Sequence, residues 1–167
     1  SVWLPYTRPG TPPQLAGTAV ARITARPTFV AELAALAKDD SHEVAADALR
    51  LVRELPEPSA TLAPGVAEAG SDIVARLGNV VKLTPEQDPS YEGAAGISVR
   101  FSAWIGAAQR LRDCCAADLA PQLRAILELA RTRPDSHALR QDVVRVASYH
   151  LQQWTGEAPL PSDPPPR

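Results

Sequence analysis

Few side chains in this sequence could serve in acid–base or nucleophilic chemistry, because the chain has only three histidines and two cysteines. His42 and His137 each follow an Asp-Ser pair, and His150 lies in an apolar stretch. A catalytic cysteine needs a neighbouring base, and no local signature brings a histidine to Cys114 or Cys115. The HExxH, GxSxG, GxGxxG and P-loop patterns do not occur. We therefore expect no catalytic residue, no metal site and no cofactor, and a neutral core imidazole at His150.

The two cysteines, Cys114 and Cys115, are adjacent. Two cysteines form no disulfide framework, their spacing is not that of a CxxC metal knuckle, and neighbouring cysteines rarely bond to each other. We expect a pair of small apolar residues in a helix or turn, in a reducing compartment. A redox-sensing thiol and a metal-binding pair remain the alternatives.

Three arginines stand between apolar residues, in the triplets LRL, VRF and VRV, at Arg50, Arg100 and Arg145. Asp47 precedes Arg50 by three positions, as Asp142 precedes Arg145, so each pair can form an ion pair on one helix. Arginine recognises carboxylates through two parallel hydrogen bonds, so an exposed row of arginines would suit an acidic peptide. The alternative is that these arginines are solvated or paired within their own helices.

A repeated phrase indicates the elements that would position these side chains. DSHEVAADALRLV begins at Asp40, and DSHALRQDVVRVA begins at Asp135. Asp40 stands three residues before Glu43, the spacing of a helix-capping box. Each phrase is therefore predicted to start the second helix of a helical hairpin. In that case His42 and His137 lie in equivalent turns on one edge of the molecule.

Apolar residues recur at helical spacing through most of the chain, and no stretch alternates as a strand would. The proline-rich ends, residues 1–13 and 157–167, are predicted to be a linker and a tail, because proline disfavours helix. Residues 14–156 are then a single all-α domain. The expected helices are 14–25, 28–38, 41–55, 66–83, 92–113, 118–133 and 136–154.

Two stretches, FVAELAALAKDDSHEVAADALRLVREL and QLRAILELARTRPDSHALRQDVVRVASYHL, resemble HEAT-type helical repeats. Each has an apolar first helix, an Asp in the turn and an aliphatic, alanine-rich second helix. A middle unit, residues 66–113, departs from the pattern with a longer break between its helices. The resemblance implies an α-α superhelix of three stacked hairpins that binds protein, with the second helices lining one surface. An irregular up-and-down helical bundle is the alternative fold.

Composition narrows the class of partner. The net charge is −2, which offers no basic face for nucleic acid. The low aromatic content of 5% predicts an aliphatic, alanine-rich core. No apolar run reaches the roughly 18 residues of a membrane span, so we expect a cytoplasmic protein. The chain does not start with Met, which indicates a fragment of a longer protein, and its preference for Arg over Lys indicates a GC-rich, bacterial genome.

From these patterns we expect an interaction, scaffold or regulatory module that binds a protein or acidic peptide. The candidate binding residues are Arg50, Arg100, Arg145, His42 and His137. Two alternatives remain open. One is a soluble domain tethered to a membrane by a segment upstream of Ser1. The other is a small-molecule-binding or enzymatic domain with a pocket near His150 and Trp104. The patterns do not indicate an oligomeric state.

Overall fold

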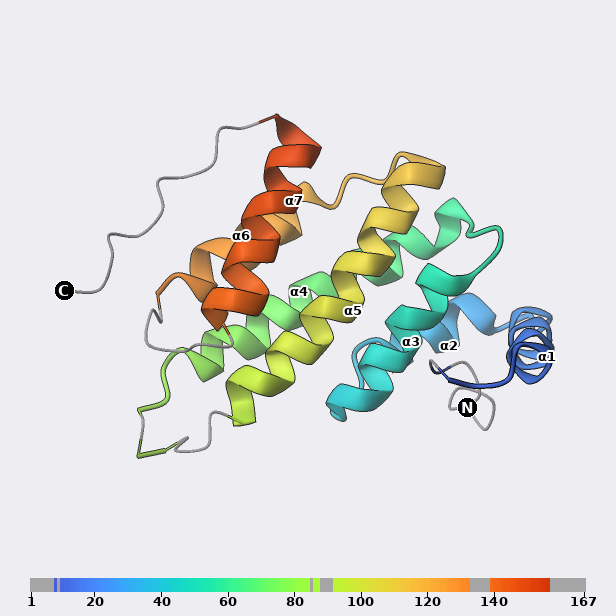
Figure 1. The fold of residues 1–167 in the computed structure, drawn as a ribbon, viewed down its shortest axis with the longest axis horizontal. Coiled ribbons are helices and arrows are strands. Elements are labelled where there is room, and N and C mark those ends of the chain that lie inside the picture. The colour runs from blue at the N-terminus through green and yellow to red at the C-terminus, as the bar shows by residue number, and fades with distance from the viewer. Residues whose placement is uncertain (1–7, 9, 85, 88–91, 133–138, 157–167) are drawn as a thin grey trace.

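The computed structural model describes residues 8, 10–84, 86–87, 92–132 and 139–156. In these residues every regular element is a helix, so the all-α prediction is confirmed (Figure 1). No helix of the described part is both long enough and apolar enough to cross a membrane. The elements are α1 Pro13–Thr24, α2 Phe29–Leu36, α3 His42–Glu54, a 3-10 turn Ala60–Leu62 (η2), α4 Ala63–Val80, α5 Glu92–Cys115, α6 Ala120–Ala130, a π-helical segment Leu139–Val144 (η3) and α7 Arg145–Thr155.

From α2 onward the helices form two rows. In one row α4 contacts α2 and α6, and in the other α5 contacts α3 and η3. Across the rows, α2 packs on α3, α4 on α5, and α6 on α7. Figure 1 shows α3, α5 and α7 running side by side in front of α4 and α6. The three predicted helix pairs are therefore in contact, and each pair also touches the next.

The core lies between the two rows and is aliphatic and alanine-rich, as the composition predicts. Trp104 of α5 is its largest fully buried side chain, and its indole Nε1 donates to the carbonyl of Val66 on α4 at 2.8 Å. A Cβ added to Gly70 would lie 2.9 Å from the Trp104 ring. Only glycine therefore lets α4 approach the indole this closely, because protein interiors are close-packed.

The start of α3 differs by one residue from the predicted capping box. Ser41 is the N-cap, and its side chain accepts a hydrogen bond from the Val44 N–H at 3.4 Å. Asp39 Oδ1 accepts from the Ser41 N–H at 2.9 Å. Asp40, the predicted cap, instead accepts from Arg76 on α4 at 3.0 Å, because the turn directs its side chain away from α3. The second copy of the phrase, from Asp135 to Ala138, lies outside the described residues.

At the end of α5 the chain reverses direction. Ala116 adopts a left-handed φ of 52°, and its N–H donates to the Arg112 carbonyl at 3.0 Å. The structure joins Cys114 and Cys115 in a disulfide bond, so the expectation of two unbonded cysteines was wrong. Both sulfurs lie against the same carbonyl group, that of Pro58, which places them on one side of the helix end.

Candidate functional site

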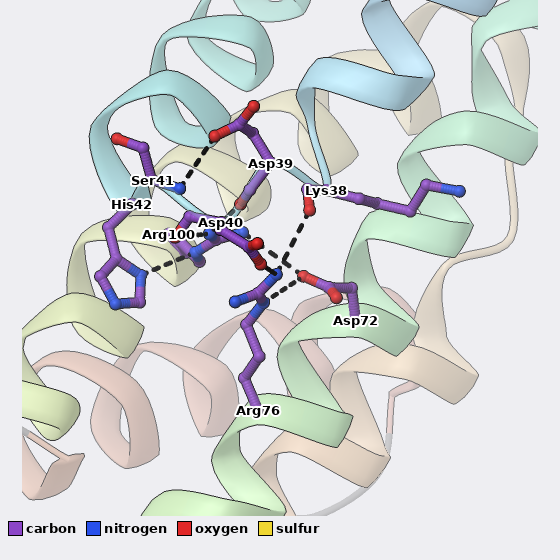
Figure 2. A network of polar contacts seen from close by, with 8 residues as sticks. All are labelled: Lys38, Asp39, Asp40, Ser41, His42, Asp72, Arg76 and Arg100. Carbon is purple, nitrogen blue, oxygen red and sulfur yellow. Dashed lines mark hydrogen bonds and ion pairs between the residues drawn. The ribbon is translucent and has the colours of Figure 1, made fainter.

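Arg100 belongs to α5, and its side chain is completely buried. The guanidinium lies against the turn that joins α2 to α3 (Figure 2). Its Nη2 donates to the carbonyls of Asp39 and Asp40, the latter at 3.0 Å. Its Nε donates to His42 Nδ1 at 2.7 Å, and its Nη1 lies 3.3 Å from Asp72 Oδ2 on α4. One guanidinium thus connects α5 to the start of α3, to the preceding turn and to α4.

His42 takes part in this network as an acceptor. Arginine has only donors, so Nδ1 of His42 must carry a lone pair and the imidazole is neutral when the bond is made. Burial is the main cause that lowers the pKa of His42, followed by the positive charges of Arg100 and Arg76. Asp72 opposes this shift with a smaller effect. The ring also lies against α5, because a Cβ at Gly96 would collide with it.

Arg76 completes the network from α4. Its Nε donates to Asp72 Oδ2 at 2.8 Å, and its Nη2 donates to Asp40 Oδ1 at 3.0 Å and to the Lys38 carbonyl at 3.3 Å. The hydrogen bond to Asp72 raises the pKa of Arg76, whereas burial lowers that of Arg100. Asp72 therefore offsets the charge of two arginines. These polar groups bind one another and hold three helices together, which is a structural arrangement.

The three predicted arginines do not form one exposed row. Arg100 is 0% exposed, whereas its neighbour Val99 is 39% exposed. In the VRF triplet the valine, and not the arginine, therefore faces solvent. This happens because α5 is covered by α3 and α4 on the side that carries Arg100. Arg145 is exposed on α7, and its Nε donates to the Gln141 carbonyl at 3.3 Å.

The two predicted ion pairs have different outcomes. Arg50 Nη1 lies 2.8 Å from Asp47 Oδ1, so the pair on α3 is confirmed. Asp142 does not pair with Arg145. It accepts a hydrogen bond from Ser98 Oγ of α5 at 2.9 Å, which links η3 to α5.

The histidines predicted elsewhere do not gather at a site. His137 lies outside the described residues. His150 is half-buried on α7, edge-on to the rings of Tyr149 and Trp154, and burial lowers its pKa. Trp104 lies in the core, and neither of the two cavities described for this structure is lined by Trp104 or His150. The structure therefore lends no support to a pocket between them.

The larger of those two cavities is a groove of about 780 Å³ between α1 and the C-terminal end of α3. One wall is the face of α1 from residue 16 to residue 24, where small side chains such as Gly17 and Ala21 leave space. The other wall is formed by Arg50 and residues 53–57, and Arg8 also lines the groove. Three arginines and two glutamates line the groove, and the buried carboxylate of Asp47 offsets part of the positive charge of Arg8 and Arg50.

A buried carboxylate orders the arginines of this groove. Asp47 is 3% exposed and accepts from Arg8 Nε at 2.5 Å and from Arg50 Nη1 at 2.8 Å. The hydrogen bond with Asp47 is the largest cause that raises the pKa of Arg8. Arg53 pairs with its neighbour Glu54 at 2.7 Å, and both of these side chains are largely exposed. The groove can thus offer guanidinium donors beside a small apolar face.

A scan against protein-family models, a search of curated proteins and a search of solved structures found no match to this chain. The resemblance to HEAT-type repeats therefore stays a prediction, and the function is inferred from the contacts themselves. In the part of the chain that the structure describes, no three His, Cys, Asp or Glu side chains gather into a possible metal site.

The sequence patterns did not reveal the groove. Arg8 falls in the segment predicted to be a linker, and its partner Asp47 lies 39 residues away. One sequence pattern did indicate such a groove, however. Gly17, Val20, Ala21 and Thr24 recur at helical spacing, which places small side chains on one face of α1. The side chains of this face are too small to form a core, so the backbone of another chain can approach α1 closely there.

Proposed function

We propose that this domain is a protein-interaction module that binds an acidic segment of a partner in the groove between α1 and α3. The observation that carries the proposal is the groove itself, with small apolar residues of α1 on one wall and arginines on the other. Such a surface suits a peptide that alternates carboxylates with apolar side chains. Arg50 and, among the groove residues, Arg8 and Arg53 are the proposed contacts.

The exposed pair of Arg53 and Glu54 supports an acidic partner. Their side chains are 45% and 53% exposed, and an ion pair at such exposure contributes little to stability. An incoming carboxylate can replace Glu54, because the guanidinium presents parallel donors that match a carboxylate. The exposure of Arg50 also supports an acidic partner. Its Nη1 is bonded to Asp47, and its side chain remains 31% exposed beside the groove.

The apolar half of the groove would accept the side chains that lie between those carboxylates. Val20 and Ala21 of α1 line the groove together with Leu55 and Pro56, which follow α3. Burial of apolar surface favours protein association, while charged pairs add specificity and speed of association.

The arrangement of the helices supports a repeat protein as the scaffold. The three helix pairs pack in succession, first helices in one row and second helices in the other, as in HEAT-like repeats. Repeat proteins of this kind offer extended surfaces to partners. Figure 1 shows α1 at the N-terminal end of the rows, and residues of α1 and α3 line the groove.

The test uses a fluorescein-labelled peptide of alternating Glu and Leu, with a Lys-Leu peptide as the charge-reversed probe. We expect fluorescence anisotropy to show binding of the acidic peptide and not of the basic one. Arg53→Glu should weaken binding by about tenfold or more, which corresponds to about 1.4 kcal/mol. Arg145→Glu makes the same change of charge on α7, outside the groove, and should leave the affinity unchanged. Equal losses in the two variants, or equal binding of the two peptides, would contradict the proposal.

A further inference from the structure

The disulfide between Cys114 and Cys115 contributes little to holding the fold together. A cross-link stabilises a protein mainly by closing a loop in the unfolded chain, and the effect grows with the length of that loop. Neighbouring residues close the shortest loop that a chain can form. The fully buried part of α5 ends at Leu111, before the pair is reached. A structural role therefore does not account for this bond.

The pair is accessible to reagents in solution. Cys114 is exposed and Cys115 is half-buried at the end of α5. Exposed disulfides exchange with thiols more readily than buried ones, because a thiolate must reach a sulfur along the line of the bond. In the reduced protein the same difference in exposure makes Cys114 the first thiol to meet an oxidant, with Cys115 beside it.

Both sulfurs lie against the loop that joins α3 to η2. The Sγ atoms of Cys114 and Cys115 are 3.8 and 3.5 Å from the Pro58 carbonyl oxygen. The same loop is held by Arg110 of α5, whose Nη2 donates to the Pro56 carbonyl at 2.9 Å. A thiol can donate a weak hydrogen bond to such a carbonyl, whereas a disulfide sulfur has no hydrogen to donate. The redox state thus changes the contact with the loop.

We infer that Cys114 and Cys115 are a reversible thiol–disulfide site for low-molecular-weight disulfides and thiols, and that reduction tightens the loop at residues 55–58. In the oxidation, the Cys114 thiolate attacks one sulfur of the small disulfide, forms a mixed disulfide and releases one thiolate. Cys115 then attacks the Cys114 sulfur, closes the intramolecular bond and releases the second thiolate. The two cysteines lose two electrons and two protons, and the small disulfide becomes two thiols.

The chemistry is tested on the full chain with glutathione disulfide as oxidant and dithiothreitol as reductant. Alkylation followed by intact mass measurement should find no free thiol after oxidation, with no glutathione retained, and both thiols after reduction. Cys115→Ser should retain one glutathione on Cys114, and Cys114→Ser should react several times more slowly. Two thiols that stay free, two retained glutathiones, or cross-linked chains would overturn the assignment.

The effect on the loop is tested by hydrogen exchange of peptides that cover residues 55–62, in the oxidised and the reduced protein. We expect exchange to slow several-fold on reduction, while peptides from α6 stay unchanged. The Cys114→Ser, Cys115→Ser double variant should respond to neither reagent. Equal exchange of the loop in both redox forms would overturn the coupling. No peptide ligand enters these measurements, so they stand or fail separately from the proposed binding in the groove.

Discussion

His42 lies where α3, α4 and α5 meet. It accepts a hydrogen bond from Arg100 of α5, and Asp72 and Arg76 of α4 lie near it (Figure 2). A proton on Nδ1 would remove the acceptor and would place a positive charge against Arg100. The geometry thus requires a neutral imidazole, in agreement with its lowered pKa.

This requirement predicts a dependence of stability on pH. The pKa of His42 in the folded chain lies below the value of 6.5 expected in the unfolded chain, so the unfolded chain binds more protons as the pH falls. The free energy of unfolding should be highest above about pH 7.5 and decrease as the pH falls through 6.5 towards the lower, folded value. Urea denaturation at pH 7.5, 6.5 and 5.5 measures this. His42→Gln, which keeps a neutral acceptor, should lose less stability over this range than the wild type.

His150 provides the matched control, because burial lowers its pKa in the same direction without an arginine partner. In His150→Gln the contribution of His42 should persist. If His42→Gln retained the full pH dependence of the wild type, protonation of His42 would not be its cause.

Among the elements, α1 has a small share in the core. Its buried residues are Ala19 and Ile23, whereas Leu15 remains 40% exposed. Because its side chains towards α3 are small, α1 leaves a groove where a larger residue would pack. The width of this groove is therefore a property of single positions on α1.

Gly17 allows the groove to be filled without disturbing the fold. A Cβ at this position would meet no atom within 4 Å, and leucine favours a helix more than glycine does. Gly17→Leu should abolish or strongly weaken binding of the acidic peptide, by about tenfold or more, with unchanged helicity by circular dichroism. Ala31→Leu, at an exposed position of α2 outside the groove, is the matched control. Undiminished binding by Gly17→Leu would place the peptide elsewhere.

At the scale of the whole molecule, the two rows share one continuous core from α2 to α7. α5 contacts α3, α4 and η3, and twelve of its residues are buried, including Trp104 and Arg100. Elements with many buried contacts open only when the whole domain unfolds, whereas elements with few open locally.

This difference predicts the pattern of native-state hydrogen exchange. Amides of α5 should exchange only through global unfolding, with a free energy equal to that from denaturant titration. Amides of α1 should exchange through local opening, at least tenfold faster, because α1 buries only two residues. Exchange measured by mass spectrometry on peptic fragments distinguishes the two. Equal protection of α1 and α5 would show that α1 is an integral part of the core.

The positions of the helices could be predicted from the sequence, because apolar spacing and helix-breaking residues act over a few neighbouring positions. Each of the first six expected helices is present with its ends shifted by a few positions. The seventh, expected from 136 to 154, begins outside the described residues and continues as the π-helical segment η3 and then α7. The pair of Asp47 and Arg50 was predictable for the same reason, since one helical turn separates the two side chains.

The candidate site depended on contacts between distant segments, which only the tertiary structure decided. The VRF and VRV triplets are alike in sequence, yet Arg100 is buried and Arg145 is exposed. Burial of a given face depends on which helices cover it, and the bond from Arg100 to His42 spans 58 residues. The groove has the same origin, because Arg8 reaches Asp47 only after the chain has folded.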